Sequence, residues 1–292
     1  MIVSAVSTTQ RPAGVLSGQV AVVTGGGRGI GRAIAQELAA VGASVAVIAR
    51  SANQLSETVS LIEEAGGRSL AVAADVTDMG TMSLAVAGVE AALGPVDLLV
   101  NNAGIGGPIG PIWEVNPDEW WRTHEVNLHG VFVGTRAVLP GMIARGAGRI
   151  VNVASHAGVH RWPQVSAYAV SKAAVIKFTE NLASETRKRG VAVFAIHPGA
   201  VLVGPTAEVL EADTDPESPA GHVAAWFRQE IANGRGVPPE RAGVLVTVLA
   251  SGRADALSGR YLTVYDDLDE LISLSAEIQR GDFYTLKLRE YR

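Results

Sequence analysis

Tyr168 and Lys172 are the side chains with the clearest potential for acid–base chemistry. They are four positions apart, so on a helix they would lie on the same face. A free phenol titrates near pH ~10, which is too high for efficient proton exchange at neutral pH, and a neighbouring ammonium group should lower that pKa. The pair therefore predicts a tyrosine that acts as a general acid or base. A half-buried tyrosine and a peripheral lysine on an ordinary amphipathic helix would have the same spacing.

Ser155 gives the pair a chemical context. It follows the apolar run 150–154, which has the pattern of a buried strand. Ligands lie at the carboxyl ends of the strands in open α/β sheets, so the Ser155 hydroxyl could hydrogen-bond a substrate oxygen and polarise it. A simple loop serine is the alternative.

A glycine-rich turn follows the apolar run 20–24 and opens directly into a helical pattern. It runs from Thr24 through three glycines, Arg28, Gly29 and Ile30 to Gly31. Glycines permit a tight turn and a close approach to a pyrophosphate, whose charge is attracted by the free N–H groups at the helix start. The turn predicts a dinucleotide site, although glycines at such corners also occur for steric reasons alone.

Short β-branched runs alternate with helical patterns along most of the chain. Strands are expected at 20–24, 44–49, 69–73, 96–101, 149–154, 191–197 and 260–264. Helices are expected at 29–41, 52–65, 78–92, 117–144, 167–189 and 239–250. This alternation predicts an α/β fold, with a single doubly wound, Rossmann-type parallel sheet and helices on both faces. The domain is expected over 18–265, after a flexible segment at 1–17.

Two regions interrupt the alternation. Residues 204–239 form a long, proline-containing connection, and we predict a mobile substrate lid there, because structureless loops of that length are unusual in compact domains. The C-terminal extension, 266–292, contains Leu268, Leu271 and Ile278 at spacings that suggest an amphipathic helix. Its apolar face would cover the parent domain or a neighbouring subunit.

The TGxxxGxG spacing of the glycine turn resembles the short-chain dehydrogenase/reductase family, and later motifs continue the resemblance. In chain order these are Asp75-Val76, Asn101-Asn102-Ala103-Gly104, Asn127, Ser155, Tyr168-Ala-Val-Ser-Lys172 and Pro198-Gly199. They agree with the family in order and spacing from about residue 18 to 265. The resemblance implies an oxidoreductase that interconverts a carbonyl and a secondary alcohol with a nicotinamide cofactor.

The resemblance also implies roles for individual residues. Tyr168 would be the general acid or base, and Ser155 would bond the substrate oxygen. Asn127 would help to hold a water chain that reaches Lys172, although an inward-facing asparagine could equally be a structural contact between helices. The cofactor would be bound by the glycine turn and the strand ends, at Gly25, Arg28, Gly29, Ile30, Gly31, Arg50, Asp75, Val76, Asn102, Ala103, Gly104, Tyr168, Lys172, Pro198, Gly199 and Val201.

The end of the second predicted strand indicates which nicotinamide cofactor is used. Family members that prefer NAD(H) have an acidic residue there for the ribose hydroxyls, whereas this chain has Ala49 followed by Arg50. Arg28 lies within the glycine turn, and two guanidinium groups can hold a 2′-phosphate with charge-assisted bonds. We therefore predict NADP(H), with NAD(H) or ordinary surface arginines as the alternatives. Asp75 would contact the adenine.

Two positions of the chain depart from the sequence pattern of the family. Val203 stands where a threonine often bonds the nicotinamide amide, with Thr206 as a possible substitute, and Tyr265-Asp266-Asp267 replaces the usual Asp-Gly-Gly.

Candidate pocket residues are mostly aromatic or histidine, namely 106–109, Trp113, His156, His160, Trp162, Trp226 and Phe227. They suggest a bulky, partly apolar substrate, although lid packing or subunit contacts would also account for them.

Composition narrows the function classes. The net charge of −5 without a basic block argues against nucleic acid, and the absence of cysteine removes thiolate metal sites and disulfides. No metal site is predicted. No signal peptide or membrane span is predicted either, so we expect a cytoplasmic protein. We also expect a homo-oligomer, either a dimer or a tetramer. An NAD-dependent alcohol dehydrogenase, a dehydratase or epimerase with bound cofactor, and a non-catalytic nucleotide-sensing scaffold are the alternative functions.

Overall fold

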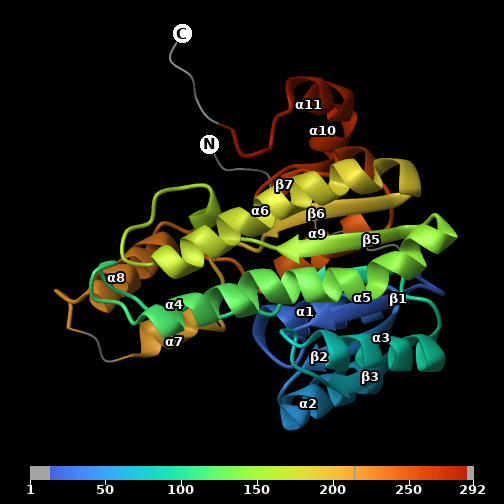
Figure 1. Ribbon diagram of the computed structural model, residues 1–292, viewed down its shortest axis with the longest axis horizontal. Coiled ribbons are helices and arrows are strands. Elements are labelled where there is room, and N and C mark those ends of the chain that lie inside the picture. The colour runs from blue at the N-terminus through green and yellow to red at the C-terminus, as the bar shows by residue number, and fades with distance from the viewer. Residues whose placement is uncertain (1–13, 213–214, 288–292) are drawn as a thin grey trace.

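A seven-stranded parallel sheet forms the centre of the computed structural model, which describes residues 14–212 and 215–287 (Figure 1). Its strands are β1 (Val20–Thr24), β2 (Ser44–Ala49), β3 (Arg68–Ala73), β4 (Leu98–Asn101), β5 (Gly148–Val153), β6 (Val191–His197) and β7 (Tyr261–Thr263). Their order is β3-β2-β1-β4-β5-β6-β7, and every neighbouring pair is parallel. All seven predicted strands are confirmed within two residues. The order reverses between β1 and β4, where open α/β sheets bind ligands.

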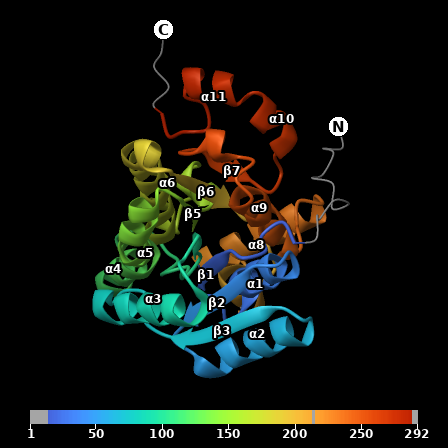
Figure 2. The ribbon, with the colours of Figure 1, turned by 90° about the vertical axis from the view of Figure 1, so that its right-hand side faces the viewer.

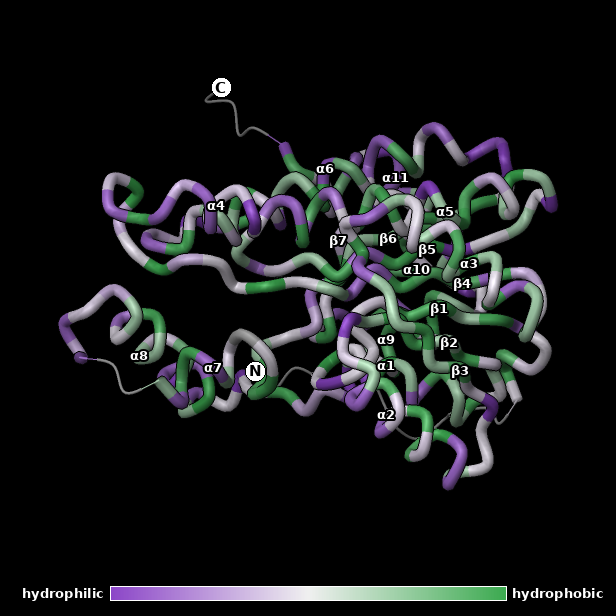
Figure 3. The backbone as a smooth tube through the Cα atoms, turned by 60° about the horizontal axis from the view of Figure 1, so that its bottom comes forward, coloured by the Kyte–Doolittle hydropathy of each residue, from purple (hydrophilic) through white to green (hydrophobic). Residues whose placement is uncertain are grey.

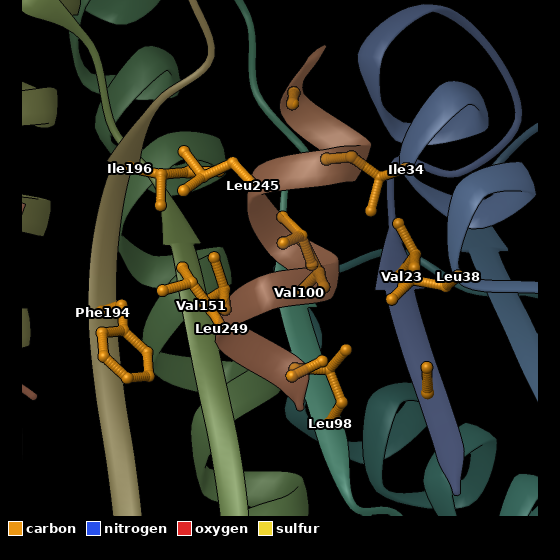
Figure 4. Close-up of a cluster of buried hydrophobic side chains, with 14 of the residues drawn as sticks. Val23, Ile34, Leu38, Leu98, Val100, Val151, Phe194, Ile196, Leu245 and Leu249 are labelled. Atoms are coloured by element: carbon orange, nitrogen blue, oxygen red, sulfur yellow. The ribbon is translucent and has the colours of Figure 1, made fainter. Parts of the chain in front are cut away.

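Helices cover both faces of the sheet, as predicted (Figure 2). One face is covered by α1 (Gly29–Ala40), α2 (Ala52–Glu64) and α9 (Glu240–Ala250), and the other by α3 (Met79–Leu93), α5 (Gly130–Arg145) and α6 (Ser166–Thr186). Successive strand residues alternate between these layers, because side chains on a strand point to opposite faces. Val23 therefore packs in the cluster with Ile34 and Leu249 (Figure 4), whereas Val22 packs in the cluster with Met82 and Met142.

The predicted single helix at 117–144 is wrong in detail. The chain forms α4 (Pro117–His124), a π-helical segment (Glu125–His129) and then α5. Hydrophobic periodicity does not mark a π-turn, which adds one residue to a turn without a change in composition. Short π-helical segments often occur at functional sites, and this one contains Asn127.

Residues 204–239 contain two helices rather than an extended connection. These are α7 (Pro205–Glu211) and α8 (Pro219–Ala232), and a proline stands in the first turn of each. Proline is favoured there because its missing N–H would have no helical partner, so these prolines begin helices rather than mark a loop. Both helices lie away from the apolar centre of the sheet (Figure 3), at the end of the molecule that also holds α4.

Both ends of the described chain pack on the domain. The extension forms α10 (Leu268–Ser273) and α11 (Ser275–Gly281), and its Leu268, Leu271 and Ile278 are buried in the same cluster as α1 and α9. This apolar face therefore covers the parent domain, which is one of the two predicted locations. At the other end, residues 14–17 lie in a turn in which Leu16 is fully buried, so these four residues are packed rather than flexible as predicted; residues 1–13 lie outside the described part.

Candidate active site

The glycine turn connects β1 to α1 at the carboxyl edge of the sheet. Gly25 and Gly29 have positive φ angles of 64° and 57°, which side chains disfavour. A Cβ atom at Gly31 would lie 2.3 Å from the carbonyl oxygen of Gly25, so this position also requires glycine. Among the described residues no side chain caps the start of α1. Its first N–H groups therefore remain available to an anion.

Asn102 holds this turn against the central strand. Its Nδ2 donates to the carbonyl oxygens of Thr24 and Gly25 at 3.0 and 3.3 Å. The Thr24 hydroxyl in turn accepts from the backbone N–H groups of Asn102 and Ala103 at 3.0 and 3.2 Å. Because β1 and β4 are neighbours in the sheet, these bonds fix the glycine turn relative to the segment after β4.

A cavity of about 540 Å³ extends from the glycine turn to α6. Of the predicted cofactor-binding residues its wall includes Gly25, Arg28, Gly29, Ile30, Gly31, Arg50, Asp75, Val76, Asn102, Ala103, Gly104, Tyr168, Lys172 and Pro198. The structure does not bring Gly199 and Val201 into this wall. The chain turns after Pro198, and both residues line a second cavity instead. We call the first one the dinucleotide cavity.

The two predicted phosphate-binding arginines have different surroundings. Arg50 lines the dinucleotide cavity beside Ala49, whereas the Arg28 guanidinium forms an ion pair of 2.9 Å with Glu208 of α7. Asp75 accepts hydrogen bonds from the N–H and hydroxyl of Thr77 at 2.9 and 2.8 Å. The backbone bond is the main cause of the lowered pKa of Asp75, and the charges of Arg122 and Arg50 lower it further.

Tyr168 and Lys172 lie in the first turns of α6, as their spacing predicts. Lys172 is buried, its Nζ donates to the carbonyl oxygen of Val153 at 2.8 Å, and burial lowers its pKa to about 8. The Nζ atom is 5.6 Å from the centre of the Tyr168 ring. The net pKa of Tyr168 is raised rather than lowered as predicted, because burial raises it and the Ser155 side chain offsets only part of this.

Ser155 lies two residues after the end of β5 and caps the start of the 3₁₀ turn His156–Gly158. Its Oγ accepts from the N–H of Ala157 at 3.2 Å, which fixes the side chain at the strand end. Its side chain is close enough to the Tyr168 phenol to lower the pKa of that group, so the structure brings the predicted serine and tyrosine together. A substrate oxygen placed between these two hydroxyls could receive a proton from one and a hydrogen bond from the other.

Asn127 is fully buried, and protein groups satisfy its side-chain amide. Its Nδ2 donates to the Ile105 carbonyl oxygen at 2.9 Å and to Ser171 Oγ at 3.0 Å, and its Oδ1 accepts from the Ile105 N–H at 2.8 Å. Asn127 therefore joins the segment after β4 to α6, one residue before Lys172. A Cβ atom added at Gly104 would lie 3.1 Å from Asn127 Oδ1 and 3.6 Å from Lys172 Nζ, so this corner is tightly packed.

A second cavity, of about 670 Å³, adjoins the dinucleotide cavity, and we call it the substrate cavity. The two share the wall residues Ile30, Ala154, Tyr168, Pro198 and Val203. Ser155 lines only the substrate cavity. Tyr168 therefore stands at the boundary between the two spaces, with Ser155 on one side and Lys172 on the other.

Most of the predicted pocket residues line the substrate cavity. Gly106, Ile109, His156, His160, Trp162, Trp226 and Phe227 are in its wall, whereas Gly107, Pro108 and Trp113 are not. Trp113 is 81% exposed, because its ring projects from the turn before α4. Trp162, Trp226 and Phe227 pack edge to face with ring centres 4.7 to 5.6 Å apart, and they connect α8 to the loop after β5. Thr206 also lines this cavity, while Val203 lines both.

Comparison with known proteins agrees with this geometry. A family model described as short chain dehydrogenase matches residues 19–214. This chain belongs to the short-chain dehydrogenase family. A short chain dehydrogenase of Pseudocercospora fijiensis is 38% identical to it over 279 residues, which cover 93% of this chain and 88% of the relative.

Solved structures in this family have the same fold. A crystal structure of an actinorhodin polyketide ketoreductase variant with NADPH has a TM-score of 0.79 and 36% identity, over 86% of this chain and 97% of that one. A crystal structure of NAD⁺-bound xylitol dehydrogenase has a TM-score of 0.78 and 30% identity, over 85% of this chain and 98% of that one. This short-chain dehydrogenase is thus an oxidoreductase of a family that uses nicotinamide dinucleotides.

Several wall residues of the dehydrogenase were not predicted. Arg122 of α4 lies 3.8 Å from Asp75 and lines the dinucleotide cavity, and His197, Arg235 and Tyr265 line the substrate cavity. His197 directly precedes Pro198 at the end of β6, so the rule that ligands lie at the carboxyl ends of strands could have identified it. Arg122 and Arg235 come from helix and loop positions that carry no local pattern.

Two further findings concern the described part of the dehydrogenase, residues 14–212 and 215–287. There, no helix combines the length and apolar character that a membrane crossing requires. In the same ranges, no cluster of three or more histidine, cysteine, aspartate or glutamate side chains could hold a metal ion.

Proposed function

We propose that this enzyme is an NADP(H)-dependent oxidoreductase that interconverts a carbonyl and a secondary alcohol, with Tyr168 as the general acid or base. The observation that carries the proposal is the position of Tyr168 in the wall shared by the two cavities, beside Ser155. A proton donor at that boundary could serve a carbonyl in the substrate cavity, and the adjoining cavity would hold a dinucleotide.

The residues of the first cavity fit a nicotinamide dinucleotide. The glycine turn has the conformation and free N–H groups that a pyrophosphate needs. Lys172, Asn102 and Gly104 line the same space near α6, and Asp75 and Val76 line it beyond β3. When bound, the cofactor supplies or accepts the hydride.

Three protein side chains position the substrate oxygen, transfer the proton and stabilise the resulting charge. In carbonyl reduction, Ser155 orients and polarises the carbonyl oxygen, and Tyr168 gives that oxygen its proton. Burial raises the pKa of Tyr168, so its phenol is protonated at neutral pH and available as an acid. Lys172 keeps a positive charge near the ring at neutral pH, because its lowered pKa of about 8 still favours the ammonium form. That charge stabilises the phenolate left after proton transfer.

The choice of NADP(H) rests on the end of β2 and on the glycine turn. Ala49 offers no carboxylate to ribose hydroxyls, and Arg50 and Arg28 both line the dinucleotide cavity. Two guanidinium groups can hold a 2′-phosphate, which NAD(H) lacks. The NADPH in the ketoreductase structure and the NAD⁺ in the xylitol dehydrogenase structure support both cofactors equally, so the preference depends on these residues.

A panel of ketones and secondary alcohols, assayed with NADPH and NADH by the absorbance of the reduced nicotinamide, tests this proposal. We expect turnover with NADPH and a kcat/KM about tenfold or more above that with NADH. A dehydratase or epimerase would convert substrate without net change in the nicotinamide, and a scaffold would bind dinucleotide without turnover. Either result, or a preference for NADH, would contradict the proposal.

A further inference from the structure

His197 ends β6, the strand beside the one that leads to Ser155. Val153 of β5 pairs with Ile196 of β6, and the Ala154 N–H donates to the Ile196 carbonyl oxygen at 2.8 Å. Ser155 therefore follows β5 and His197 ends the adjacent β6 at the same edge of the sheet, and both line the substrate cavity. Adjacent strands are roughly 5 Å apart, so a small ligand can reach both side chains.

The His197 ring has unused hydrogen-bonding capacity. Its Nδ1 is buried and has no hydrogen-bond partner among the described residues. The residue lines the cavity and only Nδ1 is buried without a partner, so Nε2 is the ring nitrogen available to a ligand there. Nothing bonded to Nδ1 fixes the tautomer, so Nε2 can present either an N–H donor or a lone pair.

The ring is also uncharged. Burial, together with the nearby His156, lowers the pKa of His197 to about 3. The rings of His156 and Tyr265 have centres 5.5 and 6.0 Å from it, and neither bonds its nitrogens. A neutral imidazole suits a hydroxyl or carbonyl oxygen and offers no charge to a carboxylate.

Two charged side chains of the same wall neutralise each other, and a third, Arg161, also lines it. Glu230 of α8 is held by Arg235 in an ion pair with two hydrogen bonds, so its charge is compensated. The Tyr265 hydroxyl donates to the Arg235 carbonyl oxygen at 2.8 Å and accepts from the Ala200 N–H at 3.1 Å. Among the described residues of this wall, His197 is a neutral polar group whose buried Nδ1 has no protein partner.

We propose that His197 is a specificity-determining residue that hydrogen-bonds a second, neutral oxygen of the substrate. The substrate class is then a ketone, or the corresponding alcohol, with a hydroxyl or second carbonyl on a carbon α or β to the reacting centre. This inference rests on the proposed carbonyl–alcohol chemistry, because Ser155 and Tyr168 mark where the first oxygen is held. The apolar remainder of the substrate packs against Trp162, Trp226 and Phe227.

The test compares benzylacetone with the same ketone bearing a hydroxyl on its β carbon, so that the two substrates differ only in the second oxygen. The readout is the ratio of their kcat/KM values with NADPH. For wild type we expect a ratio of at least about tenfold in favour of the hydroxyketone, the effect of one hydrogen bond to an otherwise unpaired group. His197→Leu should reduce the ratio to within about threefold of one, whereas His197→Gln should retain part of it.

His222→Leu is the matched control. This exposed histidine of α8 is absent from the cavity wall, so its replacement should leave the wild-type ratio unchanged. An unchanged ratio in His197→Leu, or no preference in wild type, would overturn the inference even if benzylacetone is reduced. If the leucine variant does not fold, the wild-type ratio alone tests the inference. Turnover of no ketone at all would overturn the proposed function, and this inference with it.

Discussion

Arg28 of the glycine turn and Glu208 of α7 form an ion pair of 2.9 Å, although 180 positions separate them in the chain. The pair joins the predicted phosphate site to the segment 204–239. On the same helix, Thr206 and Val209 line the substrate cavity. A ligand that attracts Arg28 therefore competes with a contact of a helix that lines the substrate cavity.

This competition leads to a prediction for Glu208→Gln. Both side chains of the pair are more than half exposed, so the pair contributes at most about 1 kcal/mol. Its removal frees Arg28 and removes a negative charge near the expected 2′-phosphate. NADPH should bind about two- to fivefold more tightly in a fluorescence titration, with NADH unchanged. Glu211→Gln on the same helix is the control, and a weaker or unchanged affinity for NADPH would contradict the competition.

Cofactor preference should depend on Arg50 and Ala49. A hydrogen bond to a charged group is typically worth about 1.5–3 kcal/mol, so Arg50→Ala should weaken NADPH binding roughly ten- to hundredfold and leave NADH nearly unaffected. Combination with Ala49→Asp should reverse the preference, because a carboxylate repels the phosphate and accepts bonds from ribose hydroxyls. The measurement is the ratio of kcat/KM for the two cofactors. If Arg50→Ala leaves this ratio unmoved, the arginine is an ordinary surface charge.

The stability of the protein should rise with pH around the pKa of Lys172. Burial lowers this pKa from 10.5 to about 8, so between these values the folded chain binds fewer protons than the unfolded chain. The cost of burying the ammonium is complete below about pH 8 and declines above it. Wild type should therefore gain on the order of 1 kcal/mol over Lys172→Met between about pH 8 and pH 9.5.

Urea unfolding of both proteins at several pH values measures this difference. The window stops below pH 10, because the raised pKa of Tyr168 acts in the opposite sense once the unfolded tyrosine ionises. A constant difference between the two proteins across the window would show that Lys172 is not destabilised by burial.

The C-terminal extension should contribute to stability through its apolar face. Ile278 is 4% exposed within the main core cluster, whereas Leu274, between α10 and α11, is 41% exposed. Ile278→Ala should lower the free energy of unfolding by about 2–4 kcal/mol, the usual cost of a cavity at a buried site. Leu274→Ala should cost less than about 1 kcal/mol. Equal effects of the two substitutions would mean that the extension does not pack on the domain.

The parallel sheet could be predicted because its strands are buried on both faces and appear as continuous apolar runs between helical patterns. Val20–Thr24 and Val191–His197 are examples in which nearly every residue is buried. Prediction from local patterns failed at Pro205 and Pro219, because proline occurs both in loops and in the first turn of helices. It also failed at Asn127, where a π-turn interrupts a helix. Neither feature changes hydrophobic periodicity.

The candidate site was predictable where its residues follow strand ends. Ser155, Asn102 and Pro198 do so, and the structure brings them to one edge of the sheet. The pKa of Tyr168 was not predictable, because spacing along a helix indicates the neighbouring lysine but not the burial that opposes it. Contacts such as Arg28 with Glu208 depend on how α7 packs, which no local pattern records.

The most direct test of the mechanism is the turnover of Tyr168→Phe with NADPH and a reducible ketone. The substitution removes the transferable proton and little volume, so NADPH affinity should stay near that of wild type while kcat falls by about 10²–10⁴. Such a loss, with unchanged cofactor binding, is the result we predict. A phenylalanine variant that retains most of the wild-type kcat would show that Tyr168 is not the proton donor and would contradict the mechanism.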